Sequence, residues 1–183
     1  MRAEKLDSRT LRTLKVIQTL FKLPYFLRTM TVKEPNYWLM KSEPDAYSID
    51  TLKNDGVTLW DGIRNYQARN FMRKMNKGDK VFFYHSNCKP PGIVGLMEVI
   101  DLNIVDPTQF DQDSKYFDPK SKPDNPRWDC VKVKYISKSN KILSLPELKI
   151  LFNEDELLVV KKGNRLSILP VRNNIAKILL EKI

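Results

Sequence analysis

The sequence is poor in the residues that build metal sites and disulfides. Its 183 residues include two cysteines and one histidine. Cys88 and Cys130 stand 42 positions apart, and together with His85 they supply too few ligands for a tetrahedral zinc site and no disulfide framework. We therefore expect no metal ion, no cofactor and a reducing compartment.

Glycine and long apolar runs are scarce as well. The chain has 6 glycines, and Gly92 and Gly95 lie in an apolar run without the lysine and helix that complete a phosphate-binding loop. No apolar run approaches the ~18 to 20 residues that cross a bilayer, because Lys, Arg or Asp interrupts each long stretch. With 42% hydrophobic and 30% charged residues, the composition is that of one ordinary globular domain without a membrane span.

Residues for catalysis are also few. His85 is the single candidate for a histidine base, with Ser86 and Cys88 near it in sequence, and neither a nucleophile elbow nor a third group accompanies them. The sequence therefore predicts no catalytic residue, and a small-molecule or nucleotide-processing protein that uses His85 is kept as an alternative. Three carboxylates fall in a polar stretch where solvated acids are the ordinary interpretation: Asp111, Asp113 and Asp118.

Basic residues outnumber acidic residues by 32 to 22, which gives a net charge of +10. This balance favours a polyanionic partner such as nucleic acid. Charge alone does not select a base, so an interaction module without base specificity is a second alternative. Six surface lysines would attract phosphate in a salt-dependent manner: Lys132, Lys134, Lys138, Lys141, Lys161 and Lys162.

The N-terminal segment differs from the rest of the chain. Residues 1–36 contain eight basic and three acidic residues, which is half of the net charge. Apolar residues recur at helical spacing over 6–21, and the pattern predicts a basic amphipathic helix. Three interpretations compete for residues 1–35: an organelle presequence, an arm for a membrane surface or nucleic acid, or a leader before a true start at Met30. We treat it as an extension before a domain at 36–183.

From residue 36 onward, short strands and short helices alternate. Strands are predicted at 37–40, 57–60, 80–85, 92–101, 130–135 and 165–169, and helices at 48–53, 64–75, 145–152 and 173–183. Residues 106–127, rich in Asp, Pro, Ser and Lys, are predicted to form a surface excursion rather than a second domain. The pattern indicates an α+β fold: a small, curved, mostly antiparallel sheet or barrel flanked by short helices, with the extra N-terminal helix.

Aromatic and hydrogen-bonding residues gather where several predicted strands end. A pocket for a flat heterocycle needs aromatic faces for stacking, at ~1 to 3 kcal/mol per base, and a few side chains to read its polar edge. The segments that begin at Lys41, Trp60, Tyr84 and Trp128 supply both. Tryptophan is also an ordinary core residue, but the polar neighbours of Trp60 favour a site at that position.

Four blocks of the sequence resemble the EVE domain family: Trp38-Leu39-Met40-Lys41-Ser42-Glu43-Pro44, Trp60-Asp61-Gly62-Ile63-Arg64-Asn65, Phe82-Phe83-Tyr84-His85-Ser86-Asn87 and Gly92-Ile93-Val94-Gly95. The resemblance extends from about residue 36 to the C-terminus. Ile63 stands where valine is common, a conservative change. The segment 153–164 is shorter and more basic than in animal members, so a role of that loop is not transferred.

The resemblance implies a PUA-like fold and a non-enzymatic binding module similar to the YTH domain. Some EVE domains are associated with modified bases, notably modified cytosines in DNA, and take up a nucleotide that has turned out of the stack. Carried onto this sequence, the resemblance makes Trp60 a stacking face, with Tyr84 or Trp128 on the opposite wall. Other positions would read polar edges or phosphate: Lys41, Ser42, Asp61, Arg64, Asn65, His85 and Ser86.

The resemblance also sets expectations for partner and compartment. The partner is nucleic acid, with modified DNA favoured and RNA as the second choice, bound by a monomer. One methyl group in an apolar pocket discriminates by only ~1 to 3 kcal/mol, so we expect a modest preference. A nuclear location is expected in a eukaryote and a cytoplasmic one in a bacterium, unless residues 1–29 direct the protein to an organelle.

Overall fold

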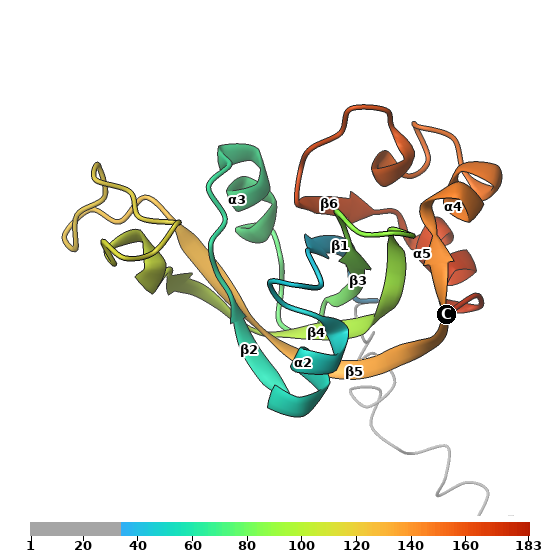
Figure 1. The fold of residues 1–183 in the computed structure, drawn as a ribbon, viewed down its shortest axis with the longest axis horizontal. Coiled ribbons are helices and arrows are strands. Elements are labelled where there is room, and N and C mark those ends of the chain that lie inside the picture. Colours follow the sequence, from blue (N-terminus) through green and yellow to red (C-terminus); the bar gives the residue numbers. More distant parts are fainter. Residues whose placement is uncertain (1–33) are drawn as a thin grey trace, which may run out of the picture. The chain divides into compact units, whose positions relative to one another are not determined.

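The computed structural model describes residues 34–183, of which Pro35–Ile183 form one compact unit. The helix predicted over 6–21 lies outside the described residues. Within residues 34–183 the chain forms six strands and four α-helices, which Figure 1 labels: β1 (Tyr37–Ser42), α2 (Ile49–Asp55), β2 (Val57–Trp60), α3 (Tyr66–Met72), β3 (Lys80–His85), β4 (Gly92–Val105), β5 (Asp129–Ser144), α4 (Leu145–Leu151), β6 (Ile168–Val171) and α5 (Asn173–Leu180). Two short 3-10 helices cover Pro107–Gln109 and Leu158–Val160.

The six strands form one mixed sheet in the order β2-β5-β4-β3-β1-β6. Each pair is antiparallel except β1 with β3, which run parallel. In the parallel pair Lys41 lies opposite Tyr84 and Ser42 opposite His85. The carboxyl ends of β1 and β3 therefore meet at the same edge. The predicted α+β fold with a curved, mostly antiparallel sheet is confirmed.

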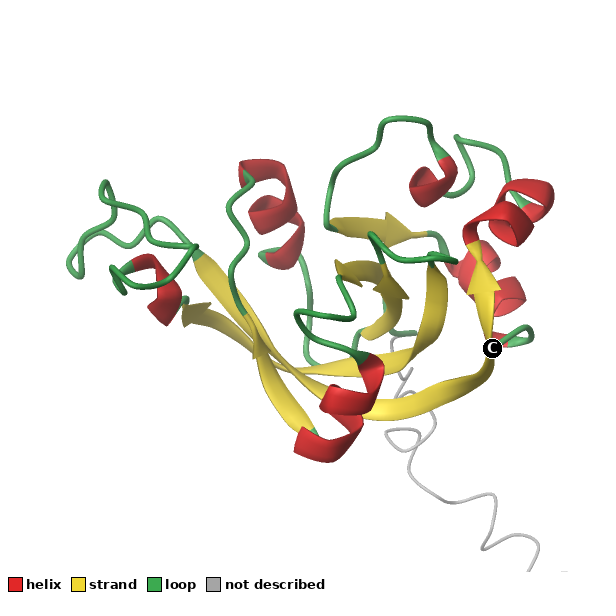
Figure 2. Ribbon diagram, viewed as in Figure 1, coloured by secondary structure: helices red, strands yellow, loops and turns green. Residues whose placement is uncertain are grey.

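The curvature of the sheet comes from its two longest strands. β4 and β5 pair over most of their length with four register shifts, and each such bulge bends and twists a strand. Figure 2 shows the two long strands running side by side and curving together. Gly95 lies at one shift, where a Cβ would sit 2.9 Å from Cδ1 of Ile49 and against the backbone of Ser137. Glycine is required there because helix α2 and β5 approach the strand too closely for a side chain.

Both faces of the sheet are covered by helices. Trp38 and Met40 point from β1 into a core that includes buried residues of α2 and α3, whereas Leu39 points into a core with buried residues of α4 and α5. On β3, Phe83 points into the first of these cores and Phe82 into the second. Burial on both faces explains why the central strands are apolar at nearly every position instead of alternating.

Several element boundaries differ from the predicted ones. Helix α3 was predicted over 64–75 but covers Tyr66–Met72, because the Asn65 side chain caps it by accepting hydrogen bonds from the Gln67 and Ala68 amides at 2.9 and 3.0 Å. Strand β5 continues to Ser144 instead of stopping at 135, because it follows the curved β4. The last strand begins at Ile168 and not at 165, since the preceding residues form a loop. No helix within residues 34–183 is long and apolar enough to cross a bilayer.

Candidate nucleic-acid interface

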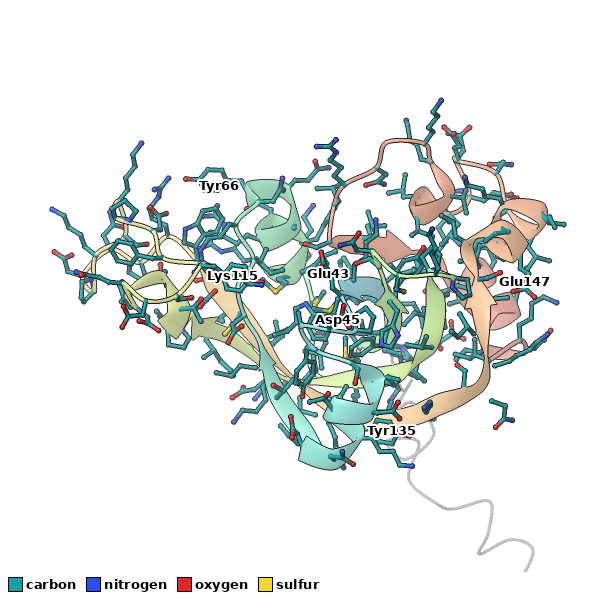
Figure 3. All side chains as sticks on the ribbon, in the orientation of Figure 1. Glu43, Asp45, Tyr66, Lys115, Tyr135 and Glu147 are labelled. Atoms are coloured by element: carbon teal, nitrogen blue, oxygen red, sulfur yellow. The ribbon has the colours of Figure 1, made fainter. Side chains whose placement is uncertain are left out.

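A cavity of about 680 Å³ lies where the ends of β1 and β2 meet the excursion 106–127. Six of the ten residues predicted for the site line it: Lys41, Ser42, Trp60, Asp61, Arg64 and Ser86. Figure 3 shows Lys115 from the excursion and Glu43 from the segment after β1 near the middle of the molecule, and both also line the cavity. Its volume is in the range of small-molecule and cofactor sites.

The parallel pairing of β1 and β3 explains why residues far apart in sequence meet at this cavity. The Ser86 amide, just after β3, donates a hydrogen bond of 2.9 Å to the Ser42 carbonyl at the end of β1. On the other side of β1 the Lys41 amide donates to the Ser167 carbonyl at 2.8 Å, which brings the loop before β6 to the cavity. The backbone thus holds three segments at fixed positions around one opening.

Trp60 is both a core residue and a wall of the cavity. Its side chain is 6% exposed and meets the Phe83 ring edge-to-face, with centroids 5.2 Å apart and planes at 82°. The residue nevertheless lines the cavity. Packing against Phe83 fixes the orientation of the indole, so the interpretation of Trp60 as a core residue is confirmed. Its role as a stacking face stays a prediction.

Arg64 joins the end of β2 to the excursion. Its guanidinium forms an ion pair of 2.7 Å with Asp106, whose side chain is fully buried, and donates to the Thr108 hydroxyl at 2.8 Å and to the Tyr116 carbonyl at 2.6 Å. The Gly62 amide donates to the same Asp106 carboxylate at 2.9 Å. With its donors used inside the protein, Arg64 fixes the shape of the wall rather than reaching into solvent.

Sequence reasoning missed several residues of the cavity. Tyr47, Lys115, Tyr116 and Arg165 line it from loops. Tyr116 packs on Gly62, where a Cβ would lie 2.6 Å from a ring carbon and where φ is +71°. The sequence indicates a turn at Gly62, but the ring that packs on it is Tyr116 of the excursion. The polar sequence around Tyr116 does not indicate that its ring packs against the domain.

Four predicted site residues do not line this cavity. Asn65 caps α3, as described above, and His85 accepts a hydrogen bond at Nε2 from the Ile49 amide at 3.1 Å. Tyr84 lines a neighbouring cavity. Trp128 stacks on Tyr66 with centroids 4.8 Å apart. Tyr84 and Trp128 therefore do not form the wall opposite Trp60. Strand β3 directs Tyr84 to the other face of the sheet, and Tyr66 covers Trp128.

Asp118 is not the solvated acid that the sequence predicts. It accepts a hydrogen bond of 2.7 Å from the Trp128 indole and is paired with Arg127 at 2.9 Å. The indole hydrogen bond, backbone donation from Lys120 and the nearby arginines lower the pKa of Asp118 in spite of some desolvation. This carboxylate holds the excursion to Arg127 and Trp128. The same excursion supplies Lys115 and Tyr116 to the cavity.

Partial burial changes the protonation behaviour of two cavity residues. Burial lowers the pKa of Lys41 from its ordinary value. Burial also raises the pKa of Asp61, which still reaches solvent; Asp106 adds to this rise and Arg64 opposes it. A ligand group of opposite polarity beside either side chain would favour its charged form. Within residues 34–183, no group of three or more His, Cys, Asp or Glu side chains is placed to hold a metal ion.

His85 gives the fold a pH dependence. Burial lowers the pKa of His85 from its ordinary value of 6.5; Asp50 opposes this shift and Lys138 adds to it. The native state needs the neutral ring, because Nε2 accepts from the Ile49 amide at the start of α2. The contribution of His85 to stability is therefore present above the unfolded-state pKa and is lost as the pH falls through the lowered native pKa.

We expect the free energy of unfolding to fall between pH 7 and pH 5 partly through His85, as measured by urea denaturation. A His85→Gln variant keeps a hydrogen-bond acceptor but does not titrate, so its stability should change less over the same range. Equal pH dependence of the two proteins would show that His85 does not contribute.

A family model for the EVE domain matches residues 36–182. The chain therefore belongs to the EVE domain family. Among characterised relatives, thymocyte nuclear protein 1 of Rattus norvegicus is 48% identical over 125 residues, which cover 62% of this chain and 55% of that protein. The chain spans about half the length of the curated relatives it matches.

Solved structures share the fold over most of the domain. A crystal structure of human THYN1 in complex with DNA that contains 5-methylcytosine is 39% identical, with a TM-score of 0.74, and the match covers 80% of this chain and 96% of that chain. A protein from Pseudomonas syringae is 43% identical, with a TM-score of 0.76, over 80% of this chain and 99% of that chain. The family and the fold implied by the sequence resemblance are thus confirmed.

Proposed function

We propose that residues 36–183 form a non-enzymatic nucleic-acid-binding module whose cavity receives a flipped, modified base, with modified cytosine favoured. The observation that carries the proposal is the cavity beside Trp60, which combines an aromatic wall with donors and acceptors at the meeting strand ends. Residues 1–35 are then an extension before this domain.

The polar residues of the cavity suit the edge of cytosine. Cytosine presents an amino donor at N4 and an acceptor at O2, so it needs both an acceptor and a donor from the protein. In this proposal the Asp61 carboxylate accepts from N4, while Lys41 and Ser42 donate to the acceptor edge. The ring stacks on Trp60, with Tyr47 and Tyr116 around it.

The charge of the cavity supports a nucleic acid as the partner. Two acidic residues line it, Glu43 and Asp61, against three basic residues that form no ion pair within residues 34–183: Lys41, Lys115 and Arg165. The fourth basic residue, Arg64, is already paired with Asp106. Phosphates that flank a flipped base would lie at this rim, where basic side chains supply salt-dependent affinity. The human relative that was crystallised with 5-methylcytosine DNA supports DNA over RNA as the partner.

The two alternatives place different demands on the site. An enzyme that uses His85 as a base would need a free imidazole near the substrate, but Nε2 accepts from the Ile49 amide and His85 does not line the cavity. An interaction module without base specificity would use only the charge. The curated relatives are named as nuclear in animals, so we propose a nuclear location if this chain is eukaryotic and a cytoplasmic one if it is bacterial.

The test is a titration of the full chain with matched DNA and RNA oligonucleotides that carry cytosine, 5-methylcytosine or 5-hydroxymethylcytosine, followed by tryptophan fluorescence at two salt concentrations. We expect tighter binding to a modified DNA, by about 5- to 100-fold over unmodified DNA, at both salt concentrations. Equal binding to every oligonucleotide that disappears at the higher salt concentration would contradict the proposal and favour a module that responds to charge alone.

A further inference from the structure

A second cavity, of about 340 Å³, adjoins the first one. Lys41 and Ser86 line both cavities, so the two are neighbours across these side chains. Three further lysines line the second cavity, Lys149 from α4 and Lys161 and Lys162 from the loop before β6, and no Asp or Glu does. A concave surface that carries only positive charge concentrates anions.

These lysines are available to a ligand. Within residues 34–183, none of Lys149, Lys161 and Lys162 forms an ion pair, whereas other lysines of the domain, such as Lys80 and Lys138, are paired with carboxylates. All three are exposed at the rim. The nearest carboxylate that contacts this segment, Glu154, accepts from the Lys162 backbone amide at 3.3 Å and forms no ion pair with the three ammonium groups.

The floor of the second cavity is apolar. Tyr84, Val159 and Val160 are 3%, 6% and 5% exposed and line it together with the exposed lysines. Burial raises the pKa of Tyr84 to about 12, so the phenol stays neutral and adds no negative charge. An apolar floor under a basic rim matches a ligand with one anionic group and one weakly polar ring, as in a sugar joined to a phosphate.

A fixed ridge separates the two cavities. The Lys41 ammonium donates to the Asn164 carbonyl at 3.3 Å. Asn164 lines the second cavity, and the next residue, Arg165, lines the first. The Asn164 side chain donates to the Leu158 carbonyl at 2.8 Å and accepts from the Leu166 amide at 3.0 Å, which holds the loop in place. Figure 1 shows this loop arching above β6.

We infer that the second cavity binds the sugar–phosphate unit next to the flipped nucleotide, with the phosphodiester at Lys161 and Lys162. The inference rests on the proposed function, because it places the strand that carries the modified base across the ridge at Lys41. Lys41 then lies between the base in one cavity and the phosphate in the other. The second cavity adds affinity and fixes the direction of the strand without reading the base.

The test uses the full chain with the double substitution Lys161→Ala and Lys162→Ala. The matched control is Lys53→Ala with Lys182→Ala, which removes the same charge from α2 and from the segment after α5, away from both cavities. The probe is a short single-stranded DNA with one 5-methylcytosine, in which each flanking phosphodiester in turn is replaced by a neutral methylphosphonate. The dissociation constant is measured for every combination.

We expect one methylphosphonate, adjacent to the modified base, to weaken wild-type binding by about tenfold. The same replacement should have little effect on the Lys161→Ala, Lys162→Ala variant, and its full effect on the control variant. The ratio of affinities for modified and unmodified DNA should stay unchanged in the variant.

Three other results have separate meanings. If every methylphosphonate weakens binding equally, in the variant and in the control, the second cavity is not a phosphate site. The proposal of a base pocket is unaffected by that result. A second result is that one methylphosphonate weakens binding only when Lys161 and Lys162 are present, while modified and unmodified DNA bind equally. This result would uphold the phosphate site and contradict the modified-base proposal. No binding of any oligonucleotide by the wild-type chain would overturn both.

Discussion

A Trp60→Ala variant is expected to lose recognition of the modified base and about 3 to 5 kcal/mol of stability, the usual cost of truncating a buried tryptophan or phenylalanine. Loss of a stacking partner alone costs ~1 to 3 kcal/mol of binding free energy, a factor of about 5 to 150. The two losses arise together because the indole packs on Phe83 and also lines the cavity. Urea denaturation and oligonucleotide titration measure them separately.

The control for this variant is Trp38→Ala. Trp38 is also 6% exposed and belongs to the same core as Trp60, but it does not line the cavity. Its loss should cost similar stability without changing the preference for a modified base in the folded fraction. A Trp60→Phe variant keeps most of the core and a smaller ring, so it tests stacking if the alanine variant unfolds. Base preference retained in both Trp60 variants would contradict the assignment of this residue.

An Arg64→Met variant is expected to lose about 3 to 5 kcal/mol, since it leaves the Asp106 carboxylate buried without its ion-pair partner. The excursion should also loosen, because Arg64 holds the Tyr116 carbonyl and the Thr108 hydroxyl. Adding Asp106→Asn removes the unpaired charge and should restore part of the lost stability. The free energy of unfolding from urea titrations measures each variant.

Lys77→Met provides the comparison for Arg64→Met. Lys77 and Asp101 form an ion pair of 2.8 Å in which both side chains are well exposed. Such surface pairs contribute ~0 to 1 kcal/mol, so this variant should be nearly as stable as the wild type. A loss of less than about 1 kcal/mol for Arg64→Met would show that Asp106 is satisfied by its other donors, the Gly62 and Thr108 amides.

The sequence indicated the elements well because each follows from local chemistry. Ser48 accepts from the Thr51 amide as a helix cap, and β3 is an apolar run of strand-forming residues. The end of β5 was missed because its second half is polar and exposed, so its residues gain from pairing with β4 rather than from burial. Local patterns do not reveal that kind of stabilisation.

The candidate site was predicted in part for a related reason. Lys41, Trp60 and Ser86 lie at the ends of β1, β2 and β3, the three strands whose ends the sequence predicted best. Which ends meet depends on the parallel register of β1 with β3, which no local pattern specifies. Tyr116 and Arg165 come from loops whose positions depend on single long-range contacts, such as the hydrogen bond from Arg64 to the Tyr116 carbonyl.

The order of the strands also has a consequence for synthesis of the protein. β1 lies between β3 and β6, so the first strand of the domain to leave the ribosome obtains its second neighbour only when the last strand emerges. Arg165 and Ser167, just before β6, close one side of the cavity. A nascent chain that stops short of β6 carries Trp60 and much of the basic charge without a finished pocket. The cavity is therefore completed only after β6 has been synthesised.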